Sequence, residues 1–145
     1  NLIFQTTLME LHLAEENNFE AVSVGETLLG LNQDNYAISK ILARAYLQNS
    51  QPKDAEGILI ELSRNKPSDP SVWYELAEAQ GLSGNILGLH RSRAEFFVLT
   101  GRYDAAIFQL REALKLSKNF FEIRESIVSR LEDIFETKKA LRELS

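Results

Sequence analysis

Cysteine is absent from the chain. Disulfide frameworks, thiolate zinc sites and thiol nucleophiles are therefore excluded. The absence fits the cytosol and the periplasm equally, so it assigns no compartment. Only three prolines and seven glycines occur among 145 residues, which is too few for an all-β protein rich in tight turns. The abundance of Leu, Ala and Glu favours helix instead.

Long apolar runs are also missing. No stretch approaches the roughly 20 apolar residues that a transmembrane helix needs, so the chain is predicted not to span a membrane. No secretory signal peptide is visible at the start. If the protein is exported, its signal lies outside this chain, and the chain is then a fragment.

Positive charge is missing from the first 39 residues, which contain six acidic residues and therefore carry a charge of −6. The rest of the chain holds 15 acidic and 16 basic residues, a balance of +1. Nucleic-acid binding requires a basic surface, so nucleic acid is not an expected partner. The acidic end is interpreted as a solvated face, and docking to a basic partner or a neighbouring domain is the alternative.

Patterns for catalysis and metal binding are scarce. The two histidines are His12 and His90. His12 precedes Glu16 by four residues, a spacing that could hold a metal on a helix, but two ligands do not make a site. Both histidines are therefore assigned to helix packing. The glycines within residues 81–88 are interpreted as turn and close-contact glycines, because no strand precedes them as in a phosphate loop. No catalytic residue, metal site or cofactor is expected in this chain.

Two helical patterns meet at a short break near position 100. Residues 86–99 and 103–117 each place apolar side chains at helical spacing, and Gly101 between them supplies the backbone freedom of a tight turn. Ala94 and Ala106 are small, which lets the two helices approach closely. The pattern predicts an antiparallel helical hairpin.

This hairpin pattern recurs along the chain. Positions that match after 34 residues are Ser39 and Trp73, Leu42 and Leu76, and Ala43 and Ala77. A helix–turn–helix unit with a period of 34 residues is typical of tetratricopeptide repeats, and the sequence resembles that family. The resemblance implies an all-α solenoid of helical hairpins whose concave face binds polypeptides.

The phase of the repeat shifts once. Ala43 and Ala94 are 51 residues apart, or one and a half periods, so helix 86–99 is expected to pair with both helix 71–83 and helix 103–117. The predicted repeat region covers residues 1–117. Its repeats are approximately residues 1–34, 36–69, 70–99 and 87–117, of which the last two overlap.

Residues 118–145 follow a different pattern. Phe120, Ile127, Ile134 and Leu141 recur every seven residues along one predicted helix. A terminal cap and a coiled-coil seam both fit this stripe. The cap is favoured, because fewer than four heptads make a short seam.

Polypeptide binding is expected on the concave face, which the first helix of each hairpin lines. Each of these residues could instead be ordinary solvated surface, and Arg44, Tyr74 and Arg91 rank highest because Arg and Tyr dominate interface energetics. The candidate partner-binding residues are Lys40, Arg44, Tyr74, Glu78, Arg91 and Glu95. Recognition of a heat-shock chaperone terminus is disfavoured, because helices 36–48 and 71–83 lack internal asparagines.

A closer resemblance covers residues 70–114, PSVWYELAEAQGLSGNILGLHRSRAEFFVLTGRYDAAIFQLREAL. Asp69-Pro70-x-x-Trp73 and Arg93-Ala94-Glu95 are among the matching segments. This stretch is similar to the C-terminal repeat region of periplasmic M48-family zinc metalloproteases that act in outer-membrane β-barrel assembly.

The resemblance implies a larger parent protein with an N-terminal zinc protease domain, whose His-Glu-x-x-His helix is absent here. The chain itself would be a non-catalytic interaction domain, and the zinc would belong to the parent. Its implied location is the periplasm, and its implied partners are the outer-membrane β-barrel assembly machinery, the substrates of that machinery and its own protease domain. The alternative is a free-standing repeat adaptor or a secretion or assembly chaperone, which would be cytoplasmic if the family resemblance does not hold.

Overall fold

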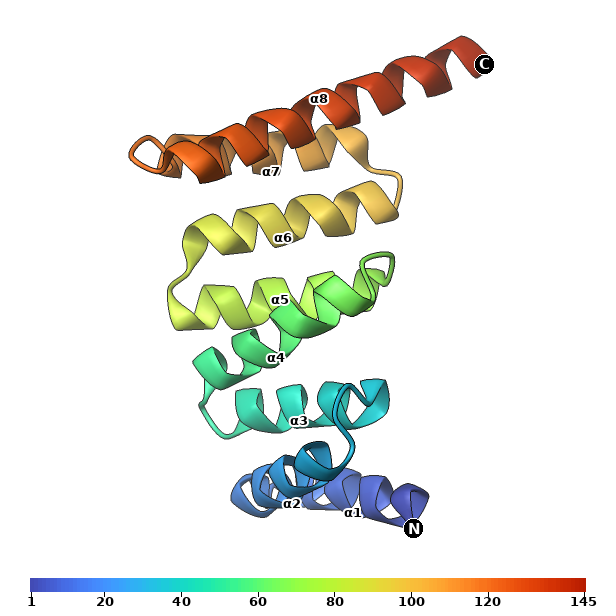
Figure 1. The fold of residues 1–145 in the computed structure, drawn as a ribbon, viewed down its shortest axis with the longest axis vertical. Helices are drawn as coiled ribbons and strands as arrows, with labels where there is room; N and C mark the ends of the chain where they lie inside the picture. Colours follow the sequence, from blue (N-terminus) through green and yellow to red (C-terminus); the bar gives the residue numbers. More distant parts are fainter. The chain divides into compact units, whose positions relative to one another are not determined.

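The computed structural model describes residues 1–145, and its only regular elements are α-helices (Figure 1). In chain order they are α1 (Leu2–Ala14), α2 (Asn18–Leu31), α3 (Tyr36–Gln48), α4 (Pro52–Asn65), α5 (Pro70–Ser83), α6 (Ile86–Leu99), α7 (Tyr103–Leu116) and α8 (Phe121–Leu144). The predicted all-α, tetratricopeptide-like succession of short helices and tight turns is confirmed. No helix is both long enough and apolar enough to cross a membrane.

Local sequence signals mark where several of these helices begin. The side chain of Asn35 accepts a hydrogen bond from the backbone N–H of Ile38 at 3.0 Å at the start of α3. Asn85 caps α6 in the same way, and such caps satisfy backbone donors that have no partner inside the helix. Pro52 and Pro70 stand in the first turns of α4 and α5, where the missing proline N–H costs no intrahelical bond.

Glycines in the left-handed region close two of the turns. Gly84, with φ of 83°, ends α5, and Gly101, with φ of 76°, lies between α6 and α7. Residues with a Cβ are strained at such positive φ values. The turn predicted at Gly101 and the assignment of Gly84 to a turn are therefore confirmed.

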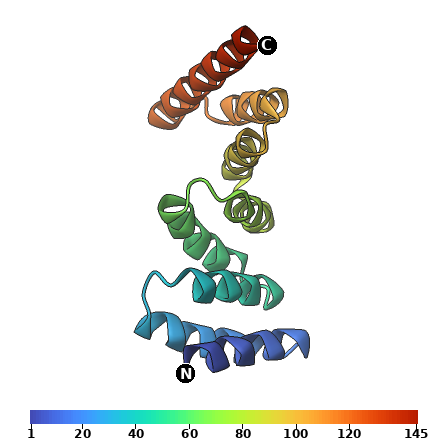
Figure 2. The same cartoon turned by 90° about the vertical axis from the view of Figure 1, so that its right-hand side faces the viewer.

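The chain divides into two compact units, residues 1–67 and 68–145. In the first unit α2 packs on α1 and α3, α3 packs on α4, and α1 also contacts α3 (Figure 2). Met9, Leu42 and Leu59 are at most 1% exposed and form its core. Gly25 lies where α2 meets its neighbours: a Cβ there would stand 2.6 Å from Met9 Cε and 2.8 Å from Leu42 Cδ1.

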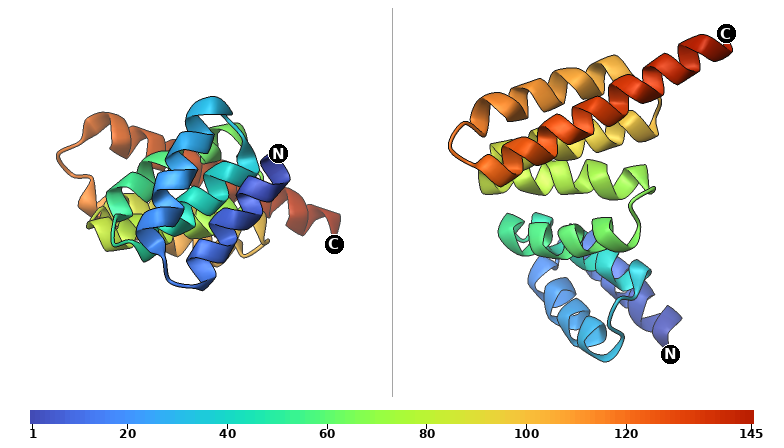
Figure 3. Two further views of the ribbon diagram at one scale, coloured as in Figure 1. Left: turned by 90° about the horizontal axis from the view of Figure 1, so that it is seen from below. Right: turned by 45° about the horizontal axis from the view of Figure 1, so that its top comes forward.

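In the second unit α6 packs against both α5 and α7 (Figure 3). This double pairing is the half-repeat shift expected from the sequence. Ala94 of α6 and Ala106 of α7 are both fully buried in the core of this unit. Their small side chains allow the two helices to lie close together, as predicted from the alanine positions.

Helix α8 packs along α7 and runs past its end, so that the C-terminus lies beyond the hairpin (Figure 1). Ile127 and Ile134 are at most 1% exposed within the core of the second unit, whereas Phe120 and Leu141 at the two ends of the seven-residue stripe are exposed. The middle of the stripe is thus buried against the chain's own helices. A capping helix, the favoured interpretation of the sequence, is confirmed.

Candidate functional site

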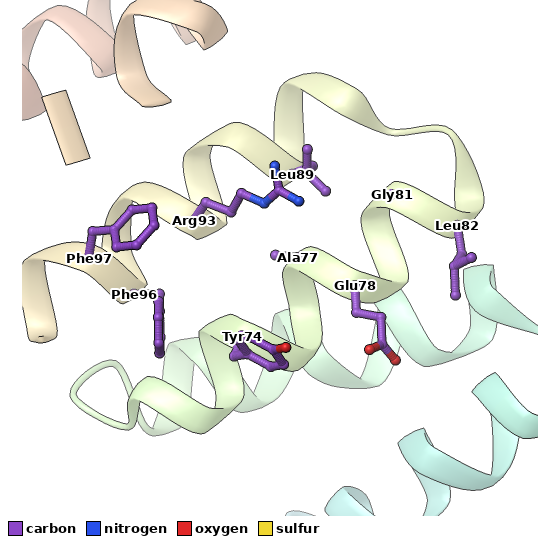
Figure 4. Close-up of a pocket in the computed structure, with 9 residues that line it drawn as sticks. All are labelled: Tyr74, Ala77, Glu78, Gly81, Leu82, Leu89, Arg93, Phe96 and Phe97. Carbon is purple, nitrogen blue, oxygen red and sulfur yellow. The ribbon is translucent and has the colours of Figure 1, made fainter. Parts of the chain in front are cut away.

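A pocket of about 390 Å³ opens between α5 and α6 within the second unit (Figure 4). Helix α5 contributes Tyr74, Ala77, Glu78, Gly81 and Leu82, and α6 contributes Leu89, Arg93, Phe96 and Phe97. The volume lies within the range of sites that hold small ligands or single anchoring side chains.

Small residues on α5 create the hollow. Ala77 is 5% exposed and presents only a methyl group. Gly81 presents no side chain, and a Cβ at this position would lie 3.0 Å from Leu89 Cδ1. Gly81 therefore lets Leu89 of α6 approach α5 closely, and Ala77 fills little of the space between the two helices. The interpretation of Gly81 as a close-contact glycine is confirmed.

Aromatic rings form one end of the pocket. The Tyr74 and Phe96 ring centroids lie 5.6 Å apart with an interplanar angle of 60°, an edge-to-face arrangement. The ring centroids of Phe96 and Phe97 lie 5.7 Å apart. Both distances lie in the favourable range for aromatic pairs, so the rings hold one another in place. Tyr74 nevertheless remains 60% exposed and is available to a partner.

The pocket carries two charged side chains of opposite sign. Arg93 lies on α6 one turn from Leu89 and one turn from Phe97, and Glu78 lies on α5. Both are exposed, and neither has a hydrogen-bond, ion-pair or ring partner within the chain. In Figure 4 the Arg93 guanidinium lies between the two helices, whereas the Glu78 carboxylate points to the opposite side of α5. An apolar hollow with an unpaired cation is suited to a partner group that combines apolar surface with negative charge.

Two of the six residues predicted from the sequence, Tyr74 and Glu78, meet in this pocket. Lys40 and Arg44 belong to the first unit. Lys40 Nζ lies 5.8 Å from the ring centroid of Tyr36. Arg44 Nη2 lies 3.8 Å from Glu10 Oε1, and both of these side chains are more than half exposed. Such an exposed pair contributes little stability and leaves Arg44 available.

The other two predicted residues, Arg91 and Glu95, contact α8. Arg91 Nη2 donates to Ser126 Oγ at 3.1 Å. Arg130 Nε and Nη2 donate to the two carboxylate oxygens of Glu95 at 2.8 and 2.9 Å. The hydrogen bonds to Glu95 are the main cause that raises the pKa of Arg130. The structure thus gives both predicted residues an intramolecular role, and their binding of a partner stays a prediction.

Leu89, Arg93 and Phe96 are pocket residues that sequence reasoning missed. The sequence did place these residues together: they and Phe97 lie at spacings of three and four along α6 and therefore share one face of that helix. The sequence pattern by itself indicates only packing for that face. The pocket arises from the open space left on α5, which the helical period of α6 does not reveal.

The two histidines lie outside this pocket. His90 Nδ1 lies 2.7 Å from Gln109 Oε1, between α6 and α7, which confirms its expected hydrogen-bonded packing role. His12 Nδ1 is buried without a hydrogen-bond partner in the first unit. No group of three or more His, Asp and Glu side chains is placed so that it could hold a metal ion.

Comparisons with known proteins agree with this architecture. Residues 12–80 match the tetratricopeptide repeat family. The chain is also similar to the β-barrel assembly-enhancing protease of Escherichia coli (strain K12), at 33% identity over 123 residues, covering 74% of this chain and 25% of the relative. The protein of that name from Yersinia pestis is 29% identical over 116 residues, covering 78% of this chain and 23% of the relative. The chain thus spans about a quarter of the length of these curated relatives.

Residues 12–80 thus resemble tetratricopeptide repeats, and the chain is similar to proteins named β-barrel assembly-enhancing protease, as its sequence indicated. Tetratricopeptide repeats are non-catalytic modules, and this match indicates protein–protein interaction as the class of function.

Proposed function

We propose that this chain is the polypeptide-binding, non-catalytic part of a periplasmic M48-family zinc metalloprotease and chaperone that serves outer-membrane protein assembly and quality control. The similarity to proteins named β-barrel assembly-enhancing protease supports this class of parent. The observation that carries the binding role is the open pocket between α5 and α6, with its exposed aromatic wall and unpaired charges.

In this proposal the chain captures β-barrel precursors or the machinery that assembles them. Strands of membrane β-barrels alternate lipid-facing apolar residues with polar residues and carry aromatic side chains near both membrane interfaces. An unassembled strand therefore exposes side chains that fit an apolar pocket of this volume. Tyr74 is the expected anchor, because tyrosines at the centre of an interface contribute a large share of the binding energy.

The proposed roles of the other candidate residues reflect their surroundings. Glu78 contacts the polypeptide beside Tyr74, and Arg44 and Lys40 provide positive charge in the first unit. Arg91 and Glu95 act through α8, which they hold in place. The zinc ion and the catalytic groups belong to the protease part of the parent. The acidic first hairpin is the proposed contact with that protease part.

Binding of an unfolded β-barrel protein to the 145-residue chain tests the proposal. A fluorescent outer-membrane β-barrel protein, diluted from urea, is titrated with the chain and monitored by fluorescence anisotropy. We expect saturable binding that Tyr74→Ala weakens about tenfold, the cost of losing a central tyrosine anchor. Phe108→Ala is the matched control, because Phe108 is 59% exposed on α7 and does not line the pocket.

Absence of binding would overturn the proposed function. Equal loss of affinity in the Tyr74→Ala and Phe108→Ala variants would overturn the placement of the site. Circular dichroism checks that both variants remain helical.

A further inference from the structure

A second pocket, of about 270 Å³, lies wholly within the first unit. It opens between α2 and α4, which both pack on α3. We propose that this pocket binds an arginine side chain of a partner polypeptide, with the guanidinium on the carboxylates of Asp34 and Glu61 and on the hydroxyl of Ser39. This site is independent of the proposed function, because neither Tyr74 nor the pocket between α5 and α6 takes part in it.

Ser39 of α3 is the buried polar group of this pocket. It is only 5% exposed, and it is the one residue of α3 in the pocket lining. Its hydroxyl has no hydrogen-bond partner within the chain, whereas Ser63 Oγ on α4 donates to the backbone carbonyl of Ile60. Buried hydroxyls are normally hydrogen-bonded, because an unsatisfied one costs free energy. A donor that enters the pocket supplies the missing bond, so Ser39 points to a polar group of a ligand.

Two carboxylates give the pocket a negative charge. Asp34 lies in the turn between α2 and α3, and its side chain has no ion-pair or hydrogen-bond partner within the chain. Glu61 on α4 is paired with Arg64 one turn further along the helix, and both of these side chains are more than 60% exposed. Such an exposed pair contributes little stability and leaves Glu61 available. No lysine or arginine lines the pocket, so its free charge suits a cation.

The apolar part of the lining selects the kind of cation. Leu29, Ile58 and Leu62 are apolar and are partly or fully buried, so they suit the methylene stem of a long basic side chain. Arginine fits better than lysine, because its guanidinium is less strongly hydrated and presents five donors in one plane. It can therefore bond two carboxylates and a hydroxyl at once. A small inorganic cation would leave the apolar surface uncovered.

The charge of the whole unit favours a basic polypeptide segment as the source of that side chain. Residues 1–67 contain nine acidic and five basic residues, a balance of −4. A surface field of this sign attracts basic partners and repels acidic ones. The match to tetratricopeptide repeats indicates protein–protein interaction. The occupant is therefore assigned as an arginine of a polypeptide rather than as a free small molecule.

NMR titration of the nitrogen-15-labelled 145-residue chain with blocked pentapeptides tests the proposal. One peptide has a central arginine between uncharged residues, and the others carry citrulline, lysine or alanine in its place. Citrulline keeps the shape of arginine and removes its charge. With the arginine peptide we expect saturable shifts of the backbone amides of residues 29–39 and 57–65. Citrulline and alanine should weaken binding about tenfold, and lysine should bind more weakly than arginine.

Asp34→Asn should weaken binding of the arginine peptide about fivefold and remove most of the advantage of arginine over citrulline. Asparagine tolerates the φ of 63° at this position, so the turn is kept. Glu20→Gln is the matched control, because it changes the net charge equally and Glu20 is an exposed acid of α2 outside the pocket.

Ser39→Ala tests the buried hydroxyl. It should weaken binding of the arginine peptide about threefold, the effect of one lost hydrogen bond. Urea unfolding of this variant should show no loss of stability, because the hydroxyl has no partner within the chain. Unchanged affinity in Ser39→Ala would remove the hydroxyl from the site and overturn the proposed contact.

Filling the pocket is a test that does not depend on charge. Gly57 lines the pocket, and a Cβ there meets nothing within 4 Å. Gly57→Leu should therefore weaken binding of the arginine peptide at least tenfold while the chain stays folded. Gly30→Leu is the matched control, because a Cβ at Gly30 of α2 also meets nothing within 4 Å and Gly30 lies outside the pocket lining.

Equal affinity for the arginine and citrulline peptides would overturn the cation site, and lysine binding as tightly as arginine would overturn the choice of a guanidinium. Equal losses in Asp34→Asn and Glu20→Gln, or full binding by Gly57→Leu, would overturn its placement in this pocket. None of these results changes the binding of an unfolded β-barrel protein through Tyr74, so the proposed function is tested separately.

Discussion

Arg130 of α8 and Glu95 of α6 form a bidentate ion pair between positions 35 residues apart in the sequence. Arg130 Nε and Nη2 each donate to a different carboxylate oxygen, at 2.8 and 2.9 Å. The planar fork fixes both distance and orientation, unlike a single contact between point charges. The pair therefore sets the position of the capping helix on α6, while Ile127 and Ile134 supply its apolar contact.

Loss of this pair should loosen α8. We expect Arg130→Ala to lower the free energy of unfolding by about 1 kcal/mol, because both side chains are partly shielded from water and two hydrogen bonds are lost. Urea unfolding measures the change, and hydrogen exchange should show faster exchange within residues 121–144. Lys115→Ala, which breaks the exposed pair with Glu112 on α7, is the control and should cost less than about 0.5 kcal/mol. Equal effects of the two substitutions would contradict the special role of the bidentate pair.

Tyr46 should make the free energy of unfolding decrease as the pH rises in the alkaline range. Burial, together with the negative charges of Glu26 and Asp54, raises the pKa of Tyr46 to about 12. The folded state therefore keeps this proton at pH values where the unfolded chain, with a tyrosine pKa near 10, loses it. The stabilisation is complete below pH 10 and is lost as the pH rises towards 12, by up to about 3 kcal/mol.

Urea unfolding at pH 9, 10 and 11 measures this loss. Tyr46→Phe should flatten the decline, because the substitution removes the titrating hydroxyl and keeps the buried ring. Tyr74→Phe is the control, since Tyr74 is 60% exposed. A decline that is as steep in Tyr46→Phe as in the original chain would assign the pH dependence to other groups.

Two glycines inside helices should respond in opposite directions to larger side chains. A Cβ at Gly25 would lie 2.6 Å from Met9 Cε, whereas a Cβ at Gly57 meets nothing within 4 Å. Gly25→Leu should destabilise the chain by about 2 kcal/mol through overpacking. Gly57→Ala should stabilise it by about 0.5–1 kcal/mol, because alanine loses less backbone entropy in a helix. Thermal unfolding compares the two variants, and a neutral or stabilising Gly25→Leu would refute the close approach of α2 to its neighbours.

The alanines at the α6–α7 crossing should tolerate no increase in size. Ala106 is fully buried against the face that also holds Ala94. We expect Ala106→Leu to lower the free energy of unfolding by about 2 kcal/mol, since the added atoms force the helices apart. Ala140→Leu on the exposed surface of α8 is the matched control and should change stability by less than about 0.5 kcal/mol. A neutral Ala106→Leu would mean that the crossing has free space.

The sequence determined the helices and their hairpins. The 34-residue period, the turn at Gly101 and the alanines at positions 94 and 106 predicted the α6–α7 hairpin, and the half-period shift predicted that α6 pairs on both sides. These features can be predicted from the sequence because the two helices of a hairpin are consecutive in the chain. The apolar face, the turn residue and the small contact residues all lie within one repeat.

The tertiary structure alone decided how side chains on these helices are used. Arg91 and Glu95 were predicted as partner-binding residues in the same way as Lys40 and Arg44. In the structure they form hydrogen bonds with α8, whose residues lie 35 positions further along the chain. Arg93 was not among the predicted binding residues, yet it lies unpaired at a pocket that it lines together with Ala77 of another helix. Helical period fixes which face a residue occupies. Whether that face meets another helix, an open pocket or water depends on contacts between separate elements, which periodicity does not encode.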